Sequence, residues 1–210
     1  MTMRQMVLAL ADAPPPTFAS FVPGRNGAAL AALEALGTPR SEERCIYLWG
    51  APGSGRSHLL AAWQAARAGE PRCQVVDDVD SLDETAQIAL FSLYNRARAG
   101  AAWLLVAGSA APGALALRDD LKSRLAWGLA FEILPLTDEE KRGALAARAA
   151  ARGIRLSAEM LDYLLARTRR DMSSLMAQID ALDRYSLEHK RAITLPLLRE
   201  ILNQNQSLLP

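Results

Sequence analysis

Apolar and polar positions along this chain follow two alternating patterns. Short, nearly continuous apolar runs are typical of strands buried on both faces of a sheet, and apolar residues at every third or fourth position predict amphipathic helices. The predicted strands span residues 45–49, 73–76, 103–107 and 129–134. The predicted helices around them cover residues 30–36, 58–68, 81–97 and 118–126, the third opening on a capping box of Ser81 and Glu84. Because strands and helices alternate, we expect an α/β fold with a parallel sheet.

The pattern changes at Pro135, after which no strand pattern recurs. Thr137 opens another capping box with Glu140, and Ser157 can cap the next helix. A final short helix is predicted at residues 193–202. The helix before it carries an apolar stripe at helical spacing, made of Met172, Leu175, Met176, Ile179 and Leu182.

We therefore expect three parts. Residues 1–16 end in three prolines, which cannot continue a helix or join the interior of a sheet, so they are interpreted as a flexible tail with a stiff linker. Residues 17–134 are predicted to form the α/β base domain. Residues 135–210 are predicted to form a small, all-helical lid domain.

Composition limits the classes of function. The 210 residues carry 24 basic and 23 acidic side chains, and a net charge of +1 provides no broad attraction to nucleic acids or anionic membranes. Cys45 and Cys73 lack metal-ligand spacing, so we expect two buried, reduced thiols. With no apolar run near 18 residues and no secretory pattern, we expect a cytoplasmic protein. The tryptophans expected in the core are Trp49, Trp63, Trp103 and Trp127.

Residues 50–57, GAPGSGRS, fit the phosphate-binding loop (P-loop) pattern G-x-x-x-x-G-K-[ST], except that Arg56 replaces the lysine. The glycines let backbone amides face a phosphate chain, the following helix adds its positive end, and Ser57 offers a hydroxyl to Mg²⁺. A glycine turn without a ligand is the alternative. The planar guanidinium of arginine cannot occupy the place of the compact lysine ammonium beside the β- and γ-phosphates. We therefore expect this loop to retain diphosphate binding better than triphosphate hydrolysis. The candidate nucleotide-binding residues are Gly50, Gly53, Ser54, Gly55, Arg56, Ser57 and His58.

Two acids follow the apolar run at residues 73–76, as at the end of a Walker B strand. In that interpretation Asp77 holds Mg²⁺ through water, together with Ser57, and Asp78 helps to orient the attacking water. Apolar residues followed by two acids also end ordinary strands. The neighbouring P-loop is what favours a metal site.

Residues 121–129, LKSRLAWGL, are similar to the arginine-finger box of the bacterial replication initiator DnaA. With the P-loop, the acidic pair and the helical C-terminal third, they make the chain resemble the DnaA-like AAA+ family. That resemblance implies a P-loop AAA+ nucleotide-binding base followed by a helical lid. It also implies that Arg124 is an arginine finger that acts in trans on a nucleotide held by a neighbouring subunit. An exposed helix arginine without such a role is the alternative.

No helix-turn-helix domain follows the core, so within this family the chain resembles the regulatory inactivators of DnaA. Residues 5–10, QMVLAL, resemble the Q-x-x-L-x-L peptide by which replication proteins bind the DNA polymerase sliding clamp (beta subunit). Gln5, Leu8 and Leu10 are the candidate clamp-binding residues, because such an extended peptide suits an apolar groove. A tail with leucines at these positions by chance is the alternative.

Three departures from the family pattern are apparent. A short link at residues 69–72 replaces a strand and a helix, so we expect a sheet reduced to four strands. Ser109 stands where the sensor 1 segment usually has an acidic residue. Ser173 stands where the sensor 2 arginine belongs, and Arg170 or Arg169 is the candidate substitute. Together with Arg56, these changes point away from an independent ATPase.

We therefore expect a negative regulator of chromosomal replication initiation that binds ADP or ATP with Mg²⁺, docks on the clamp and stimulates hydrolysis of ATP bound to DnaA. Homo-oligomers are compatible with this reading, whereas sequence-specific DNA binding and membrane association are not expected. The alternative is a self-sufficient AAA+ ATPase, such as a clamp-loader or helicase-loader subunit, whose turnover needs Asp77 and Asp78. A P-loop phosphotransferase lacks a candidate base in this sequence.

Overall fold

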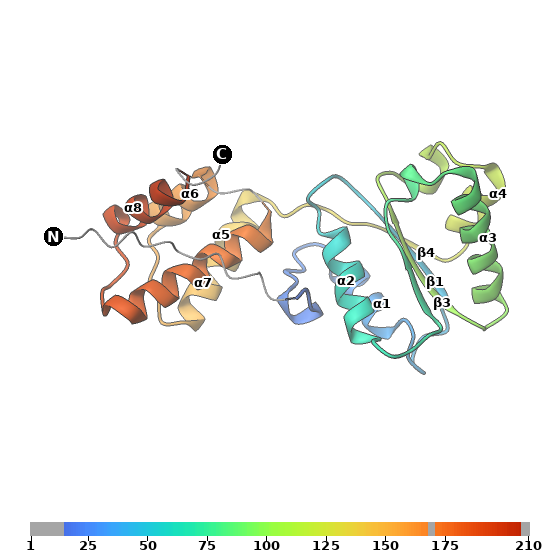
Figure 1. The fold of residues 1–210 in the computed structure, drawn as a ribbon, viewed down its shortest axis with the longest axis horizontal. Helices are drawn as coiled ribbons and strands as arrows, with labels where there is room; N and C mark the ends of the chain where they lie inside the picture. The colour runs from blue at the N-terminus through green and yellow to red at the C-terminus, as the bar shows by residue number, and fades with distance from the viewer. Residues whose placement is uncertain (1–14, 168–170, 207–210) are drawn as a thin grey trace. The chain divides into compact units, whose positions relative to one another are not determined.

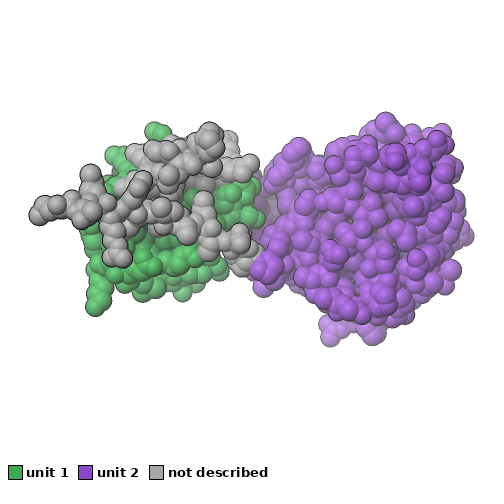
Figure 2. All heavy atoms as spheres, in the orientation of Figure 1, with its two compact units in different colours: residues 1–14, 137–210 green, residues 15–136 purple. Residues whose placement is uncertain are grey.

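A computed structural model describes residues 15–167 and 171–206 of the chain. The described residues fall into two compact units. The first in chain order is Pro15–Leu136, which is purple and keyed as unit 2 in Figure 2; the second runs from Thr137 onward and is green, keyed there as unit 1. Each unit has its own hydrophobic core.

The first unit contains one sheet of four parallel strands, drawn edge-on among its helices in Figure 1. The strands are β1 (Cys45–Trp49), β2 (Cys73–Val76), β3 (Trp103–Gly108) and β4 (Leu129–Glu132), in the spatial order β2-β3-β1-β4. The predicted parallel sheet is confirmed, and so is its reduction to four strands. β3 is buried along its whole length, whereas β2 and β4 are the edges and are only partly covered.

Helices cover both faces of this sheet. They are α1 (Gly27–Ala35), α2 (Arg56–Ala66), α3 (Glu84–Arg98) and α4 (Asp119–Leu125). Because side chains alternate along a strand, Ile46 and Leu48 of β1 pack against α1 and α2. Tyr47 points to the opposite face, where α3 and α4 supply the core. The helices α2 and α4 therefore lie on opposite sides of the sheet.

The capping box predicted at Ser81 is wrong. Residues Val79–Ser81 form a 3-10 turn, and the Ser81 hydroxyl donates to the Asp78 carbonyl. The helix α3 instead begins at Glu84, and the Asp83 carboxylate caps it by accepting from the Ala86 amide at 2.8 Å. The 3-10 turn occupies Ser81, and so it moves the start of the helix towards the C-terminus.

Other predicted boundaries and burials need smaller corrections. α2 begins at Arg56, two residues before the predicted start, and β4 ends at Glu132, two residues before the predicted end. Trp127 is 49% exposed because it lies in the turn between α4 and the edge strand β4. Ile88, which the helical spacing places on an apolar face, is exposed on α3. Cys73, on the other edge strand, is only half-buried.

The second unit is helical, as predicted. It consists of α5 (Asp138–Ala151), α6 (Ala158–Arg167), α7 (Met172–His189) and α8 (Leu195–Gln206), the last beginning two residues later than predicted. The capping box at Thr137 is confirmed, and Ser157 accepts from the Met160 amide at the start of α6. The leucine and isoleucine members of the predicted stripe lie in the core of this unit. None of the helices described is long and apolar enough to cross a membrane.

A buried asparagine joins the two ends of the first unit. Asn26, only 4% exposed, donates from its amide nitrogen to the Leu134 carbonyl at 2.9 Å and accepts from the Leu134 amide at 2.8 Å. Next to it, the Arg25 guanidinium donates to the Pro135 carbonyl at 2.9 Å. These bonds hold the backbone that leaves β4 just before the second unit begins.

Replacing Asn26 by alanine is expected to destabilise the first unit by about 2–4 kcal/mol, because both Leu134 backbone groups lose buried partners. Urea denaturation measures this loss. Asn95→Ala, at an exposed position of α3, is the matched control and should change the free energy of unfolding by less than about 0.5 kcal/mol. Equal effects of the two substitutions would contradict a structural role for the Asn26 pair.

Candidate functional site

The predicted P-loop is a turn that links β1 directly to α2. Gly53 and Gly55 have φ angles of 78° and 102°, which glycine adopts without the strain that a side chain would cause. Gly55 occupies the N-cap position of α2 and provides no side-chain cap. The first amides of this helix therefore remain as donors for an anion at its positive end.

One buried polar atom of this loop has no partner within the described part of the chain. The Ser54 hydroxyl lies in a side chain that is 7% exposed, yet it makes no hydrogen bond. A Cβ added to Gly53, in contrast, would meet nothing within 4 Å. Amide donors, an unpaired hydroxyl and open space beside Gly53 fit a phosphate chain.

The N-terminal segment of the first unit covers the start of α2. Phe21 lies so close to Gly55 that a Cβ there would be 2.9 Å from its ring. The His58 imidazole faces this segment, with Nε2 3.0 Å from the Thr17 carbonyl oxygen and 3.3 Å from the Ser20 hydroxyl. Phe21 was not among the candidate residues predicted from the sequence. Its neighbourhood depends on the fold, so no local motif marked it as part of the site.

Arg56 turns its guanidinium towards the neighbouring strand. It donates to the carbonyl of Gly108, the last residue of β3, which pairs with Trp49 just before the P-loop. Ser57, the candidate Mg²⁺ ligand, is exposed at the start of α2. The guanidinium is thus bonded to the end of β3.

The acidic pair lies at the same end of the sheet, after β2. The Asp77 carboxylate accepts from the Asp78 amide at 2.9 Å, and both side chains are exposed. Asp78 has a left-handed backbone with φ of 54°. In the described ranges, 15–167 and 171–206, no group of three or more histidine, cysteine or acidic side chains is arranged to hold a metal ion. A Mg²⁺ ion here would therefore need phosphate and water oxygens besides Asp77 and Ser57.

A third acid, Asp80, lies nearby and was not predicted as a site residue. The Asp80 carboxylate accepts from the Ser109 amide at 2.6 Å and from the Ser109 hydroxyl at 2.7 Å. Ser109 directly follows β3, so a carboxylate lies at the strand end where the resemblance implied one. It comes from a residue 29 positions away in the sequence. Because only the strand order brings the two residues together, no sequence motif indicated the pair.

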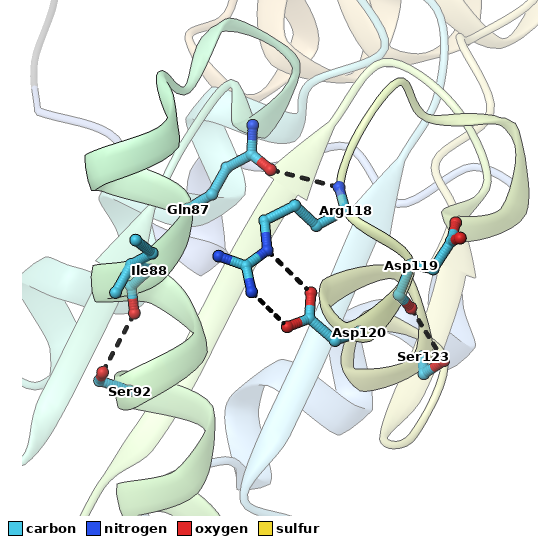
Figure 3. Close-up of polar contacts among 7 residues, drawn as sticks. All are labelled: Gln87, Ile88, Ser92, Arg118, Asp119, Asp120 and Ser123. Carbon is cyan, nitrogen blue, oxygen red and sulfur yellow. Dashed lines mark hydrogen bonds and ion pairs between the residues drawn. The ribbon is translucent and has the colours of Figure 1, made fainter.

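The remaining arginine of interest lies on the other side of the sheet. Arg124, in the last turn of α4, has its guanidinium carbon 5.2 Å from the centre of the Phe91 ring on α3. Figure 3 shows how the start of α4 is held: the Gln87 side chain accepts from the Arg118 amide, and the Arg118 guanidinium binds the Asp120 carboxylate. No carboxylate of the residues described forms an ion pair with Arg124.

Several candidate residues lie outside the described part of the chain. They are the clamp-binding candidates Gln5, Leu8 and Leu10 and the sensor 2 substitutes Arg169 and Arg170. Ser173, in contrast, is exposed in the first turn of α7.

A P-loop between a strand and a helix, a parallel sheet flanked by helices and an all-helical second unit define the AAA+ class. Residues 138–202 match the family model described as "Hda, lid domain". Domain III of DnaA from Thermotoga maritima has 20% sequence identity and a TM-score of 0.66, and the match covers 90% of this chain and 96% of that one.

Two further solved structures share the fold. AMPPCP-bound DnaA from Aquifex aeolicus has 22% identity and a TM-score of 0.65, over 84% of this chain and 70% of that one. The RuvB variant R170A from T. maritima has 16% identity and a TM-score of 0.62, over 92% and 73%. The chain therefore shares the AAA+ fold of DnaA domain III, and its residues 138–202 match the lid domain of the Hda family. The resemblance drawn from the motifs is confirmed.

Replacing Gly50 by alanine is expected to destabilise the first unit by about 2–4 kcal/mol. Its φ is 153°, and a Cβ there would overlap the Ile133 carbonyl oxygen, so overpacking adds to backbone strain. Chemical denaturation measures the change. Gly113→Ala, whose added Cβ would meet nothing within 4 Å, should stay within about 0.5 kcal/mol of wild type. A Gly50→Ala protein as stable as this control would show that the loop relaxes freely.

Proposed function

We propose that this chain is a nucleotide-binding negative regulator of chromosomal replication initiation that stimulates hydrolysis of ATP bound to DnaA. The observation that carries the proposal is the position of Arg124 on the helix layer opposite α2. An arginine on that layer is suited to a nucleotide held by another molecule. The Hda lid match and the DnaA-like fold support DnaA as that molecule.

The nucleotide, ADP or ATP, would bind at the P-loop. The amides at the start of α2, the Ser54 hydroxyl and the Arg56 guanidinium would hold its phosphates, with Phe21 and His58 beside the loop. A Mg²⁺ ion bound by Ser57 and Asp77 would neutralise phosphate charge, with Asp78 beside it. The AMPPCP bound to DnaA from A. aeolicus supports this assignment by similarity of fold.

Three positions that assist hydrolysis in the family pattern carry other residues here, and this favours a regulator over an efficient ATPase. Arg56 is bonded to the Gly108 carbonyl, and the Ser109 donors are bonded to Asp80. Ser173 occupies the place that the resemblance assigns to the sensor 2 arginine, with Arg170 the candidate substitute. A cation inserted in trans would instead stabilise the charge of the transition state on the partner's ATP.

The aromatic contact of Arg124 supports a finger that is already oriented. A guanidinium over a ring face is attracted to it and loses rotational freedom. Because no carboxylate pairs with it among the residues described, no ion pair has to break before Arg124 reaches a phosphate. This arrangement costs less side-chain entropy on docking than a freely rotating arginine would.

Docking on the sliding clamp through Gln5, Leu8 and Leu10 completes the proposal. A clamp loaded on DNA would bring this near-neutral protein to the DNA without a basic surface of its own. Holding this protein and DnaA on the same DNA would raise their effective concentration. That would favour the encounter with DnaA even if the direct contact is weak.

Arg124→Ala should abolish the stimulation of DnaA. Arginine fingers contribute about 10³ to 10⁵ in rate in other NTPases, so the variant should leave DnaA near its intrinsic rate of ATP hydrolysis. The assay measures phosphate release from DnaA with DNA-loaded clamp, ADP and this protein. Arg72→Ala, in the turn just before the edge strand β2, removes an equal charge and should retain the stimulation. Full stimulation by Arg124→Ala would rule out the finger.

Gln5→Ala and Leu8→Ala should each reduce retention on immobilised clamp by at least about tenfold. Both remove side chains that the Q-x-x-L-x-L pattern uses to fill its groove. Met6→Ala, at a variable position of the same peptide, is the control and should bind like wild type. Retention of all three variants would exclude this tail as the clamp contact.

The self-sufficient ATPase is the second candidate, and it is favoured by the retention of Asp77, Asp78 and Ser57. It requires turnover by the purified chain without DnaA, lost in Asp77→Asn and Asp78→Asn. Turnover of that kind, combined with no effect on DnaA, would replace the proposed function with this one.

A further inference from the structure

We propose that Asp80 is a specificity-determining residue that makes the nucleotide site prefer a diphosphate to a triphosphate. The inference rests on the nucleotide site of the proposed function. Asp80 belongs to none of the sequence motifs, and the similar proteins assign it no role. The inference concerns the affinity of this chain for its own nucleotide and not the effect on DnaA.

The register of the sheet places the Asp80 carboxylate beside the P-loop. Trp49 of β1 pairs with Gly108 of β3 in parallel, so Gly50 and Ser109 are the next residues of two neighbouring strands. Ser109 binds both oxygens of Asp80. The negative charge is therefore fixed at the strand end next to the loop that would hold the phosphates.

The enclosure of Gly108 shows how tightly this carboxylate is positioned. A Cβ on Gly108 would overlap the Tyr47 hydroxyl and lie 2.8 Å from Val79 Cγ2 and 3.2 Å from Asp80 Oδ2. The Tyr47 hydroxyl donates to the Ala110 carbonyl at 2.6 Å. Burial raises the pKa of Tyr47, the Asp80 charge raises it further, and the Arg56 charge lowers it. Both charges thus act on the same buried hydroxyl.

Arg56 does not cancel the charge of Asp80 by a direct ion pair. Its guanidinium donates to the Gly108 carbonyl, and within the residues described no nitrogen of Arg56 lies within ion-pair distance of the Asp80 carboxylate. A β-phosphate can still use the other donors of the arginine fork. A γ-phosphate brings one more negative charge to a strand end that already holds a carboxylate.

The expected discrimination is moderate because Asp80 is exposed and its charge is screened. A like charge a few ångströms away in a partly solvated site changes affinity by about tenfold. The preference for the diphosphate should therefore be largest without Mg²⁺ and at low ionic strength. It should shrink as salt is added, which a purely steric exclusion of the γ-phosphate would not do.

The test measures dissociation constants of ADP and AMPPCP by calorimetry, in EDTA and low salt, for the full chain. Wild type should bind ADP about tenfold more tightly than AMPPCP. Asp80→Asn keeps the shape and the acceptor for the Ser109 amide but removes the charge, so the ratio should fall to about threefold or less. Glu84→Gln, in the first turn of α3, removes the same charge elsewhere and should keep the wild-type ratio.

Ser109→Ala tests whether the preference depends on the Asp80 charge or on the local hydrogen bonds. It removes one of the two bonds but leaves the carboxylate, so the preference for ADP should remain about tenfold. An unchanged ratio in Asp80→Asn, or an equal fall in Glu84→Gln, overturns the inference and leaves the proposed function standing. If wild type binds neither nucleotide, the nucleotide site of the proposed function fails, and this inference fails with it.

Discussion

The parallel pairing of β1 with β3 is the contact on which the rest of this protein depends. It is the centre of the sheet, and residues on both faces of the two strands are buried against helices. The P-loop leaves β1 at the point where Ser109 leaves β3. Shifting this register by one residue would turn every side chain of one strand to the opposite face, so the hydrophobic pattern holds the site in place.

In the proposed function, these strand ends form a modified ATPase site. Arg56 stands where the P-loop pattern has a lysine and is bonded to the backbone of β3. Ser109, at the position that the resemblance assigns to sensor 1, is bonded to the Asp80 carboxylate. On that proposal, the residues that would bind phosphate are retained, whereas those that would assist hydrolysis are changed. Under the proposed function, a molecule with this site and with Arg124 on the other helix layer would act on a partner's nucleotide more readily than on its own.

The N-terminal segment of the base also binds the backbone just before the lid begins. The segment that covers the P-loop with Phe21 continues to Arg25 and Asn26, which bind the backbone at Leu134 and Pro135. One stretch of about ten residues therefore contacts both the start of α2 and the chain that leads into the lid. A buried amide suits this position because it satisfies a donor and an acceptor of the same residue at once.

The sequence by itself determined where the strands lie, that the sheet is parallel and short, that the C-terminal third is helical, and where the P-loop falls. These features follow from local periodicity, glycine spacing and capping residues, all of which involve residues close together in the sequence. Only the tertiary structure decided the partners of Arg56, Asp80 and Asn26, and the exposure of Trp127. Asn26 and Leu134 are 108 positions apart, and such pairs depend on strand order and packing, which no local pattern records.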